Sequence, residues 1–176
     1  MRKLKLEELG RKSVEEFKAA PKINVRVLLD NVRSMNNVGS AFRTSDAFLI
    51  DKLYLCGITA TPPHRDIRKS ALGAEESMDW EYANDPLDVI RSLKSEGYTI
   101  LSVEQATDSS SLDGFEVNPD QKYLLVFGNE VKGVDDLVIQ QSDGCLEIPQ
   151  FGSKHSLNIS VSIGIVLWKF AQAFHR

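Results

Sequence analysis

Short apolar segments rich in Val, Ile and Leu alternate with segments of helical periodicity along most of this 176-residue chain. Segments of the first kind are typical of buried strands, and segments of the second kind are typical of helices that cover a sheet. The sequence therefore predicts an α/β fold, with a mainly parallel sheet and helices on both faces. The predicted strands cover residues 25–30, 52–57, 98–103, 123–128 and 145–149, and the predicted helices cover 38–49, 86–96, 135–141 and 158–174.

The chain divides into a short charged segment and one predicted domain. Residues 1–23 are predicted to be a short helical extension, with a helix over 4–20 that ends before Pro21. Residues 24–176 are predicted to form a single domain, because a chain of this length buries roughly 70% of its unfolded surface without disulfides or metals. Residues 58–70 are predicted to be a polar loop.

Cysteine spacing and hydropathy indicate where such a chain works. Cys56 and Cys145 are far apart, the N-terminus lacks the apolar run of a signal peptide, and no apolar stretch reaches the roughly 20 residues of a membrane span. We therefore expect a cytoplasmic protein with reduced thiols and no membrane segment. The histidines and cysteines do not fall at the spacing of metal ligands, so we expect no metal site.

Three loops that follow predicted strands are rich in Gly, Asn and Ser, at residues 30–43, 127–134 and 148–162. Because ligands bind outside the carboxyl ends of parallel strands, we expect the functional site there. The spacing G-x-x-x-x-G at 128–133 is followed by Val134 and Asp135, not by the Lys and Ser or Thr of a phosphate-binding loop. The chain also has no G-x-G-x-x-G after a strand and no G-x-S-x-G, which argues against an ordinary dinucleotide fold and a simple serine hydrolase.

Taken together and in this order, the three loops resemble the motifs of the ribose 2′-O-methyltransferase branch (SpoU, or TrmH-like) of the SPOUT superfamily. The matching segments are N-x-G-x-x-x-R-T-x-D-A-F at 37–48, F-G-N-E-x-x-G at 127–133 and I-P-x-x-G-x-x-x-S-L-N-x-S-V at 148–161. The segment K-S-A-L-G-A-E-E at 69–76 is similar to a further loop of the family, and the resemblance covers residues 24–174. It implies a sheet whose C-terminal part is tied into a deep trefoil knot, a site for S-adenosyl-L-methionine built from the knot loops, and an obligate homodimer.

The resemblance also implies roles for ten residues of this sequence. Functional positions in catalysis are matched by Asn37, Arg43, Glu130, Ser156 and Asn158. Cofactor contacts, largely through the backbone, are matched by Val103, Glu104, Gly128, Ile148 and Leu157. A guanidinium group binds its proton too tightly to act as a general base, which makes Arg43 unsuitable for that role. We therefore expect Arg43 to hold the target phosphate and ribose and to stabilise the developing alkoxide.

Each polar position has a structural alternative that the sequence alone leaves open. These alternatives are helix caps, a surface ion pair and a solvated charge. They comprise an N-cap at Asn37 for a helix that starts at Val38, an ion pair of Arg43 with Asp46, a solvated Glu130, and N-caps of the last helix at Ser156 and Asn158.

The activity that the resemblance implies is the S-adenosyl-L-methionine-dependent methylation of a ribose 2′-hydroxyl in tRNA or rRNA, with S-adenosyl-L-homocysteine as the product. The short segment before the first strand favours tRNA. A non-catalytic RNA-binding paralogue of the same fold and a base-methylating SPOUT enzyme are the alternatives. A second copy of the chain is the other expected partner, through the C-terminal helix, because that helix is apolar nearly all round from Val161 to Trp168.

Charge is unevenly distributed along the chain, although the formal net charge is only −4. Residues 1–43 hold 10 basic and 5 acidic side chains, residues 44–150 hold 8 and 20, and residues 151–176 hold 3 and none. The positive excess falls on the N-terminal segment and on the first and third motifs. We therefore expect a local basic face around Arg43 that binds the RNA backbone and weakens with salt, despite a pI of about 5.4.

Overall fold

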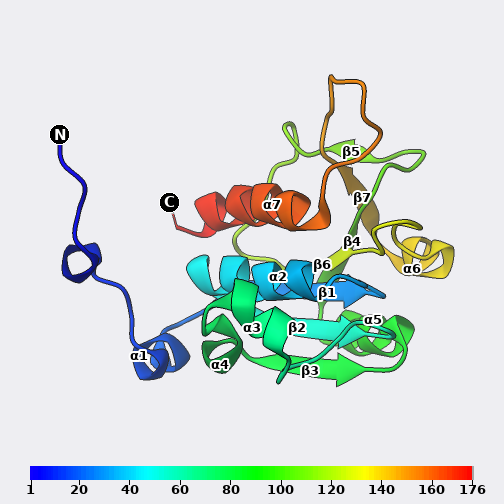
Figure 1. Cartoon of the computed structure of the whole chain (residues 1–176). Coiled ribbons are helices and arrows are strands. Elements are labelled where there is room, and N and C mark those ends of the chain that lie inside the picture. Colours follow the sequence, from blue (N-terminus) through cyan, green and yellow to red (C-terminus); the bar gives the residue numbers. More distant parts are fainter. Residues whose placement is uncertain (176) are drawn as a thin grey trace.

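The computed structural model describes residues 1–175, which form a seven-stranded sheet with helices on both faces (Figure 1). The strand order is β3-β2-β1-β6-β4-β7-β5, and every strand pair is parallel. The strands are β1 (Ile23–Asp30), β2 (Ile50–Cys56), β3 (Trp80–Ala83), β4 (Tyr98–Val103), β5 (Ser110–Ser111), β6 (Lys122–Phe127) and β7 (Gly144–Glu147). The predicted α/β fold with a mainly parallel sheet is confirmed.

Seven α-helices accompany the sheet within the described residues. They are α1 (Val14–Ala19), α2 (Met35–Ala47), α3 (Arg65–Ala71), α4 (Ala74–Ser77), α5 (Pro86–Ser95), α6 (Asp136–Gln141) and α7 (Ile159–Phe174). A short 3-10 helix, Leu6–Leu9, precedes them. None of the helices in residues 1–175 has the length and apolar character needed to cross a membrane.

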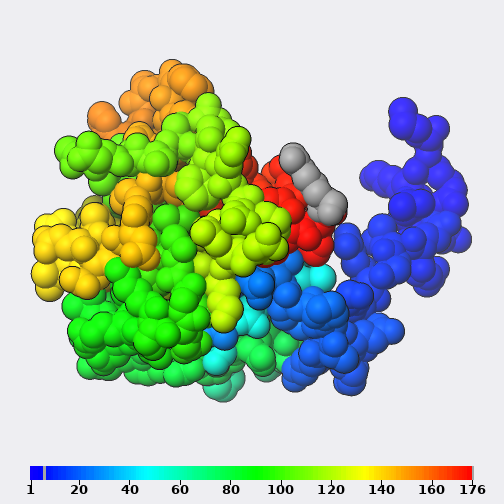
Figure 2. Space-filling view, turned by 180° about the vertical axis from the view of Figure 1, so that it is seen from behind, coloured from blue at the N-terminus to red at the C-terminus, as the bar shows by residue number. Residues whose placement is uncertain are grey.

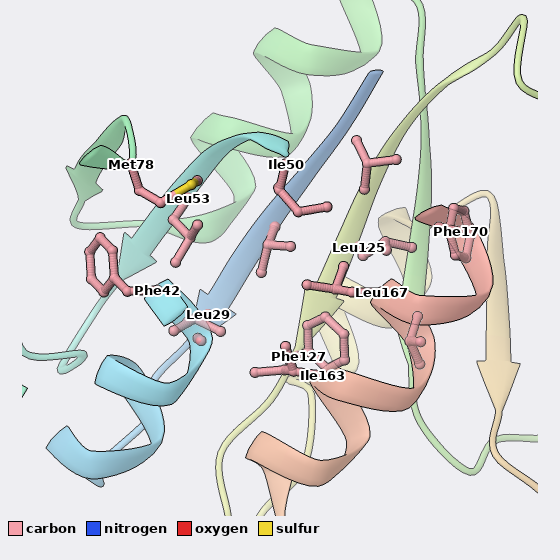
Figure 3. Packing of buried hydrophobic residues seen from close by; sticks show 14 of the residues in the cluster. Leu29, Phe42, Ile50, Leu53, Met78, Leu125, Phe127, Ile163, Leu167 and Phe170 are labelled. Atoms are coloured by element: carbon pink, nitrogen blue, oxygen red, sulfur yellow. The ribbon is translucent and has the colours of Figure 1, made fainter. Parts of the chain in front are cut away.

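Two apolar clusters pack against the two faces of the sheet. Val27 and Leu29 of β1 enter the larger cluster, with side chains of α2 and α7, while Leu28 between them enters the smaller cluster with α5 and α6. Figure 3 shows the larger cluster, where Phe127 at the end of β6 lies beside Ile163 of α7. Because both faces are covered, the central strands are apolar without alternation, which is why they are recognisable in the sequence.

The N-terminal segment differs from its prediction. The helix predicted over residues 4–20 is wrong as a single element, because Gly10 adopts a left-handed conformation with φ +57° and ends the 3-10 helix. A new helix starts after Ser13, whose side chain and that of Glu16 form a capping box. Residues before α1 extend away from the sheet in both views of the molecule (Figures 1 and 2), and Phe17 of α1 is buried in the larger cluster.

The segment between β2 and α5 is also more structured than predicted. The polar loop predicted over residues 58–70 contains α3, which begins after His64 and buries Ile67 and Ala71 against the larger cluster. With two buried residues out of seven, this helix has too weak an apolar period for its sequence to reveal it. The sequence also did not predict α4, β3 and β5. The predicted division into an extension and one domain stays a prediction, and Arg176 lies outside the described residues.

Candidate active site

The carboxyl ends of four neighbouring strands bring the three Gly- and Asn-rich loops together. β1 pairs with β6, β6 with β4, and β4 with β7, so the loops after β1, β6 and β7 leave the same edge of the sheet. A cavity of about 660 Å³ lies there. Its volume is within the range of small-molecule sites. Within residues 1–175 no group of three or more His, Cys, Asp or Glu side chains is arranged to hold a metal ion.

The cavity wall contains most of the residues that the family resemblance points to. All five expected cofactor residues line it, namely Val103, Glu104, Gly128, Ile148 and Leu157. Glu130, Ser156 and Asn158 line it as well, whereas Asn37 and Arg43 do not. The structure thus brings eight of the ten positions to one cavity and leaves two outside it.

Glu130 ties the second loop to the first. Its carboxylate accepts hydrogen bonds from the backbone N–H groups of Arg33 and Ser34, each at 2.9 Å, and from Nδ2 of Asn37 at 3.0 Å. Burial raises the pKa of the Glu130 carboxyl, but these three hydrogen bonds more than offset it, so the pKa lies below its usual value. Glu130 is therefore an ionised anchor for the loop that precedes α2, not merely a solvated charge.

Asn37 does not cap a helix, because α2 begins earlier than predicted. Its N-cap is Ser34, whose hydroxyl accepts from the backbone N–H of Asn37 at 3.3 Å. Asn37 therefore lies in the first turn of α2, nearly buried, and its side-chain amide is directed to Glu130. The structural alternative that the sequence left open for Asn37 is wrong.

Arg43 lies two turns further along α2 and is exposed. Among the described residues it forms no ion pair with Asp46, whose Oδ2 accepts the hydroxyl hydrogen of Ser77 at 2.5 Å. α2 can approach α3 closely next to this position, since a Cβ on Gly39 would lie 2.3 Å from the carbonyl oxygen of Ile67. Because Arg43 is exposed and forms no ion pair with the described residues, its guanidinium is available to a partner outside the chain.

The second loop is shaped by Asn129, which the sequence analysis did not single out. Its Oδ1 accepts from the backbone N–H groups of Val131 and Lys132, at 2.9 and 3.1 Å, and its Nδ2 donates to the carbonyl oxygen of Asn31 at 2.7 Å. The backbones of Asn129 and Gly133 also exchange two hydrogen bonds of 2.9 Å. The asparagine directly after F-G was the available signal, because its side chain can replace backbone partners in a tight loop.

Two glycines of this loop are required by close approach. A Cβ on Gly128 would lie 2.1 Å from the backbone nitrogen of Val134. Gly133 has φ +73°, and a Cβ there would lie 2.2 Å from Oε2 of Glu104. That same Oε2 accepts the backbone N–H of Val134 at 3.1 Å, so the end of β4 holds the second loop in place. The glycines leave backbone groups uncovered along the cavity wall.

Asp30 and Asn31 join the first loop to its neighbours. Asp30 is buried at the end of β1 and accepts from Nδ2 of Asn31 at 2.7 Å and from the backbone N–H of Asp135 at 3.2 Å. Burial raises the pKa of the Asp30 carboxyl above its usual value, in spite of these two hydrogen bonds. Asn31 has φ +55° and accepts from the backbone N–H of Ile58. The sequence analysis singled out neither residue: Asp30 was placed at the end of a predicted strand, and Asn31 only within the first loop.

The third loop contributes Ser156 and Asn158. Asn158 is the N-cap of α7, and its Oδ1 accepts from the backbone N–H and the hydroxyl of Ser160 at 2.8 and 2.6 Å. The capping role considered for Asn158 is therefore real in this structure, while the one considered for Ser156 is wrong. Both residues are exposed and border the cavity.

The fold and this cavity define an α/β protein with a candidate ligand site at the carboxyl ends of a parallel sheet. The model of the SpoU rRNA Methylase family matches residues 24–168. The chain belongs to this family, and the resemblance of its three loops to the SpoU/TrmH-like branch is confirmed.

Curated proteins and solved structures are similar to much of the chain. A tRNA (guanosine(18)-2'-O)-methyltransferase of Thermus thermophilus is 26% identical over 92% of this chain and 81% of its own length. A 23S rRNA (guanosine-2'-O-)-methyltransferase of Neisseria meningitidis is 30% identical over 80% of this chain and 55% of its own length. The AdoMet-bound rRNA methyltransferase from Sinorhizobium meliloti has a similar fold, with a TM-score of 0.80 at 24% identity, over 89% of this chain and 59% of that one. The chain spans 61% or less of the length of several curated relatives that it matches.

Proposed function

We propose that this chain is an S-adenosyl-L-methionine-dependent RNA methyltransferase that acts on a ribose 2′-hydroxyl in tRNA or rRNA. One observation carries the proposal: in a chain of a methylase family, the second and third motif loops and the segment after β4 line a single cavity at the carboxyl ends of the sheet, and Glu130 of its wall is hydrogen-bonded to the first motif loop. The names of the Thermus and Neisseria relatives, both 2'-O-methyltransferases of RNA, support it.

The cavity fits the proposed cofactor in size and chemistry. Apolar side chains at Leu146, Ile148 and Leu157 can receive a flat adenine ring. The acidic side chains of Glu104 and Glu130 on the same wall suit a ligand that carries a positive sulfonium. The AdoMet-bound state of the Sinorhizobium neighbour also supports this choice of cofactor.

The proposed reaction divides between the cavity and Arg43. S-adenosyl-L-methionine would supply an electrophilic methyl group, and the ribose 2′-oxygen would form the new C–O bond while the C–S bond breaks and its electron pair stays on sulfur. The hydroxyl is a weak nucleophile and must lose its proton near the transition state. Arg43 would hold the neighbouring phosphate and stabilise the developing alkoxide, with the phosphate as the proton acceptor.

The remaining polar residues are proposed to orient the reactants. Glu130 and Asn37 fix the start of α2, the helix that carries Arg43. Ser156 and Asn158 border the cavity at the start of α7. A small displacement of the methyl group from the ribose oxygen costs a large part of the rate, which is why such anchors matter.

The RNA backbone is proposed to bind along α2 and α3. Arg43 is exposed on α2, and Arg65, Arg68 and Lys69 are exposed on α3, which packs against α2 at Gly39. Arg68 is partly neutralised by Glu75 at 3.5 Å. Arg65, Arg68 and Lys69 belong to residues 44–150, which carry an excess of acidic side chains. The local distribution of charge on the surface therefore matters more than the net charge of the segment. We favour tRNA as the substrate, since the Thermus relative, a tRNA enzyme, aligns over 81% of its own length.

We propose a homodimer through α7. Val161, Ile165 and Trp168 form an exposed apolar stripe along this helix, and the ring of Trp168 is covered on one side by Phe48. A stripe of this kind on a soluble protein indicates a partner, and a second copy would bury both stripes at once. Light scattering of the wild type and of an Ile165→Lys variant tests this; a wild-type monomer at micromolar concentration would contradict the proposal.

The trefoil knot is proposed on the family resemblance. It is supported by the position of α7, whose Phe170 stacks on Phe115 in the connection between β4 and β6 at 6.0 Å between centroids. Nζ of Lys169 also donates to the carbonyl oxygen of Asp113 in that connection. The last helix is thus held between this connection and α2, as a threaded C-terminus requires.

A cytoplasmic location is also proposed, because the two cysteines are free thiols and are buried.

Calorimetry with S-adenosyl-L-methionine and methyl transfer to RNA test the proposed function. The enzyme should bind the cofactor and methylate tRNA or rRNA, and a 2′-deoxy nucleotide at the modified position should receive no methyl group. Methylation of the deoxy substrate would favour a base-methylating enzyme. RNA binding without cofactor binding would favour a non-catalytic paralogue.

A further inference from the structure

Phe151, in the loop between β7 and α7, is the most exposed aromatic side chain of the described residues, at 96%. Figure 1 shows this loop rising beyond the end of the sheet, and Figure 2 shows the same segment at the periphery of the molecule. Single exposed apolar residues are common, so exposure alone assigns no role. The surroundings of this ring are more specific.

The loop that carries Phe151 is part of the cavity on both sides of it. Gln150 directly before the ring and Ser156 five residues after it both line the cavity. Nε2 of Gln105, two residues after β4, donates to the carbonyl oxygen of His155 at 2.8 Å and ties the loop to the cavity wall. The loop that carries Phe151 therefore borders the cavity.

A cation follows Phe151 in the same loop. Lys154 is exposed three residues after it, and the sequence has no acidic residue after Glu147. A site that binds another protein through apolar contacts has a broad apolar patch, but the sequence neighbours of Phe151 are Gln150, Gly152 and Ser153. An aromatic ring beside cationic and small polar residues is the arrangement that binds an unpaired base by stacking while the phosphate meets the cation.

We propose that Phe151 is a stacking platform for an unpaired base of the RNA next to the target ribose, with Lys154 contacting the adjoining phosphate. This inference rests on the proposed function and adds the form of RNA that the site accepts: a loop, bulge or single strand, not the interior of a duplex. Phe151 is then a specificity-determining residue that acts on RNA binding and leaves the cofactor cavity unchanged.

The test compares four proteins: the wild type, Phe151→Ala, Phe151→Leu and Phe151→Trp. Binding is measured by fluorescence anisotropy with a labelled single strand of about 12 nucleotides of mixed sequence and with the matching blunt duplex. Leu137→Ala is the control, because Leu137 is also an exposed apolar side chain outside the cavity wall, but it belongs to α6 and not to the loop between β7 and α7. Calorimetry with S-adenosyl-L-methionine and sedimentation are run on every variant.

The wild type should prefer the single strand. Phe151→Ala and Phe151→Leu should weaken its binding roughly 5- to 100-fold, in line with the loss of one stacked base, while Phe151→Trp stays within about twofold. Cofactor binding, sedimentation and the Leu137→Ala control should not change.

Equal binding by the Ala variant, or a Leu variant as good as the wild type, would overturn the stacking role. A change of oligomeric state in the Ala variant would also overturn it and place Phe151 at a subunit contact. Both results leave the proposed function intact if the wild type binds the cofactor and methylates RNA. If the wild type does neither, the proposed function fails, and the role of Phe151 fails with it.

Discussion

Nδ2 of Asn37 donates to Oε1 of Glu130 at 3.0 Å, although 93 residues separate the two in sequence. The same carboxylate accepts the backbone N–H groups of Arg33 and Ser34, directly before α2. One acidic side chain thus fixes the entrance of the helix that carries Arg43. Because this anchor lies on the loop that also forms the cavity wall, the position of α2 is tied to the proposed cofactor site.

Removing the anchor should cost stability. Glu130→Ala leaves three donors without their protein acceptor, and we expect the free energy of unfolding to fall by about 1–2 kcal/mol, since the exposed donors regain water. A double-mutant cycle with Asn37→Ala should give a coupling of at least about 0.5 kcal/mol in urea unfolding. Lys132→Ala, an exposed residue of the same loop, is the control and should change stability by less than about 0.5 kcal/mol. Additive effects of the two variants would contradict the anchor.

The anchor should also be sensitive to pH. The pKa of Glu130 is lowered from 4.5 in the folded state, so its contribution to stability is present above the unfolded value and is lost as the pH falls through the folded one. Glu130→Gln should therefore be less stable than the wild type at pH 7, and the difference should shrink below a pH of about 4.5. Urea unfolding across this range measures it. A difference that grows on acidification would contradict the lowered pKa.

The meeting of three loops at one edge could be predicted, because the carboxyl ends of parallel strands share an edge and each loop follows a strand that its apolar run reveals. The partner of Glu130 could not. The contact with Asn37 depends on β1 lying next to β6, and the insertion of β6 between β1 and β4 is a long-range choice of the sheet that no local pattern encodes.

The missed elements have a different reason. β3, Trp80–Ala83, has no fully buried residue, and both residues of β5 are exposed serines, so neither has the apolar signature of a strand. The position of Arg43 relative to the cavity could also not be predicted from the sequence. Its motif suggested a single cluster of catalytic residues, whereas the helix carries it away from the cavity wall.

The close contact between α2 and α3 predicts that adding a side-chain methyl group at Gly39 destabilises the protein. Alanine is usually a better helix former than glycine by about 1 kcal/mol, but Cβ on Gly39 would lie 2.1 Å from Oγ of Ser70 and 2.3 Å from the carbonyl oxygen of Ile67. Gly39→Ala should therefore lower the free energy of unfolding by about 1–3 kcal/mol. Asn36→Ala, at the exposed neighbouring face of α2, should leave it unchanged or raise it slightly. A Gly39→Ala protein as stable as the wild type would mean that α3 can move away.

The two thiols should react only slowly in the native protein. Burial, followed by the charge of Asp30, raises the pKa of Cys56 to about 12, and burial raises that of Cys145. At pH 8 a disulfide reagent should therefore modify Cys56 only on unfolding, and Cys145 more slowly than free cysteine. Both should react at once in denaturant. Rapid modification of Cys56 in the folded protein would contradict its burial.

The Arg43→Lys variant distinguishes the role of Arg43 in methyl transfer from the binding of the cofactor in the cavity. Lysine keeps the charge but loses the planar fork that can hold phosphate and ribose oxygen together. Because Arg43 lies outside the cavity wall, the variant should bind S-adenosyl-L-methionine within about twofold of the wild type, while methyl transfer falls roughly 100- to 1000-fold, as for the loss of a group that stabilises an oxyanion.

Arg65→Lys on α3 is the matched control, since the same change at a residue that only meets the RNA backbone should alter kcat little and KM modestly. Cofactor binding is measured by calorimetry and methyl transfer with labelled S-adenosyl-L-methionine. Unchanged turnover in Arg43→Lys would show that charge alone suffices at this position. Loss of cofactor binding in the same variant would instead show that Arg43 lies beside a cofactor. Because Arg43 lies outside the cavity wall of its own chain, that cofactor would be bound by a second copy, joined through the exposed apolar side chains of α7.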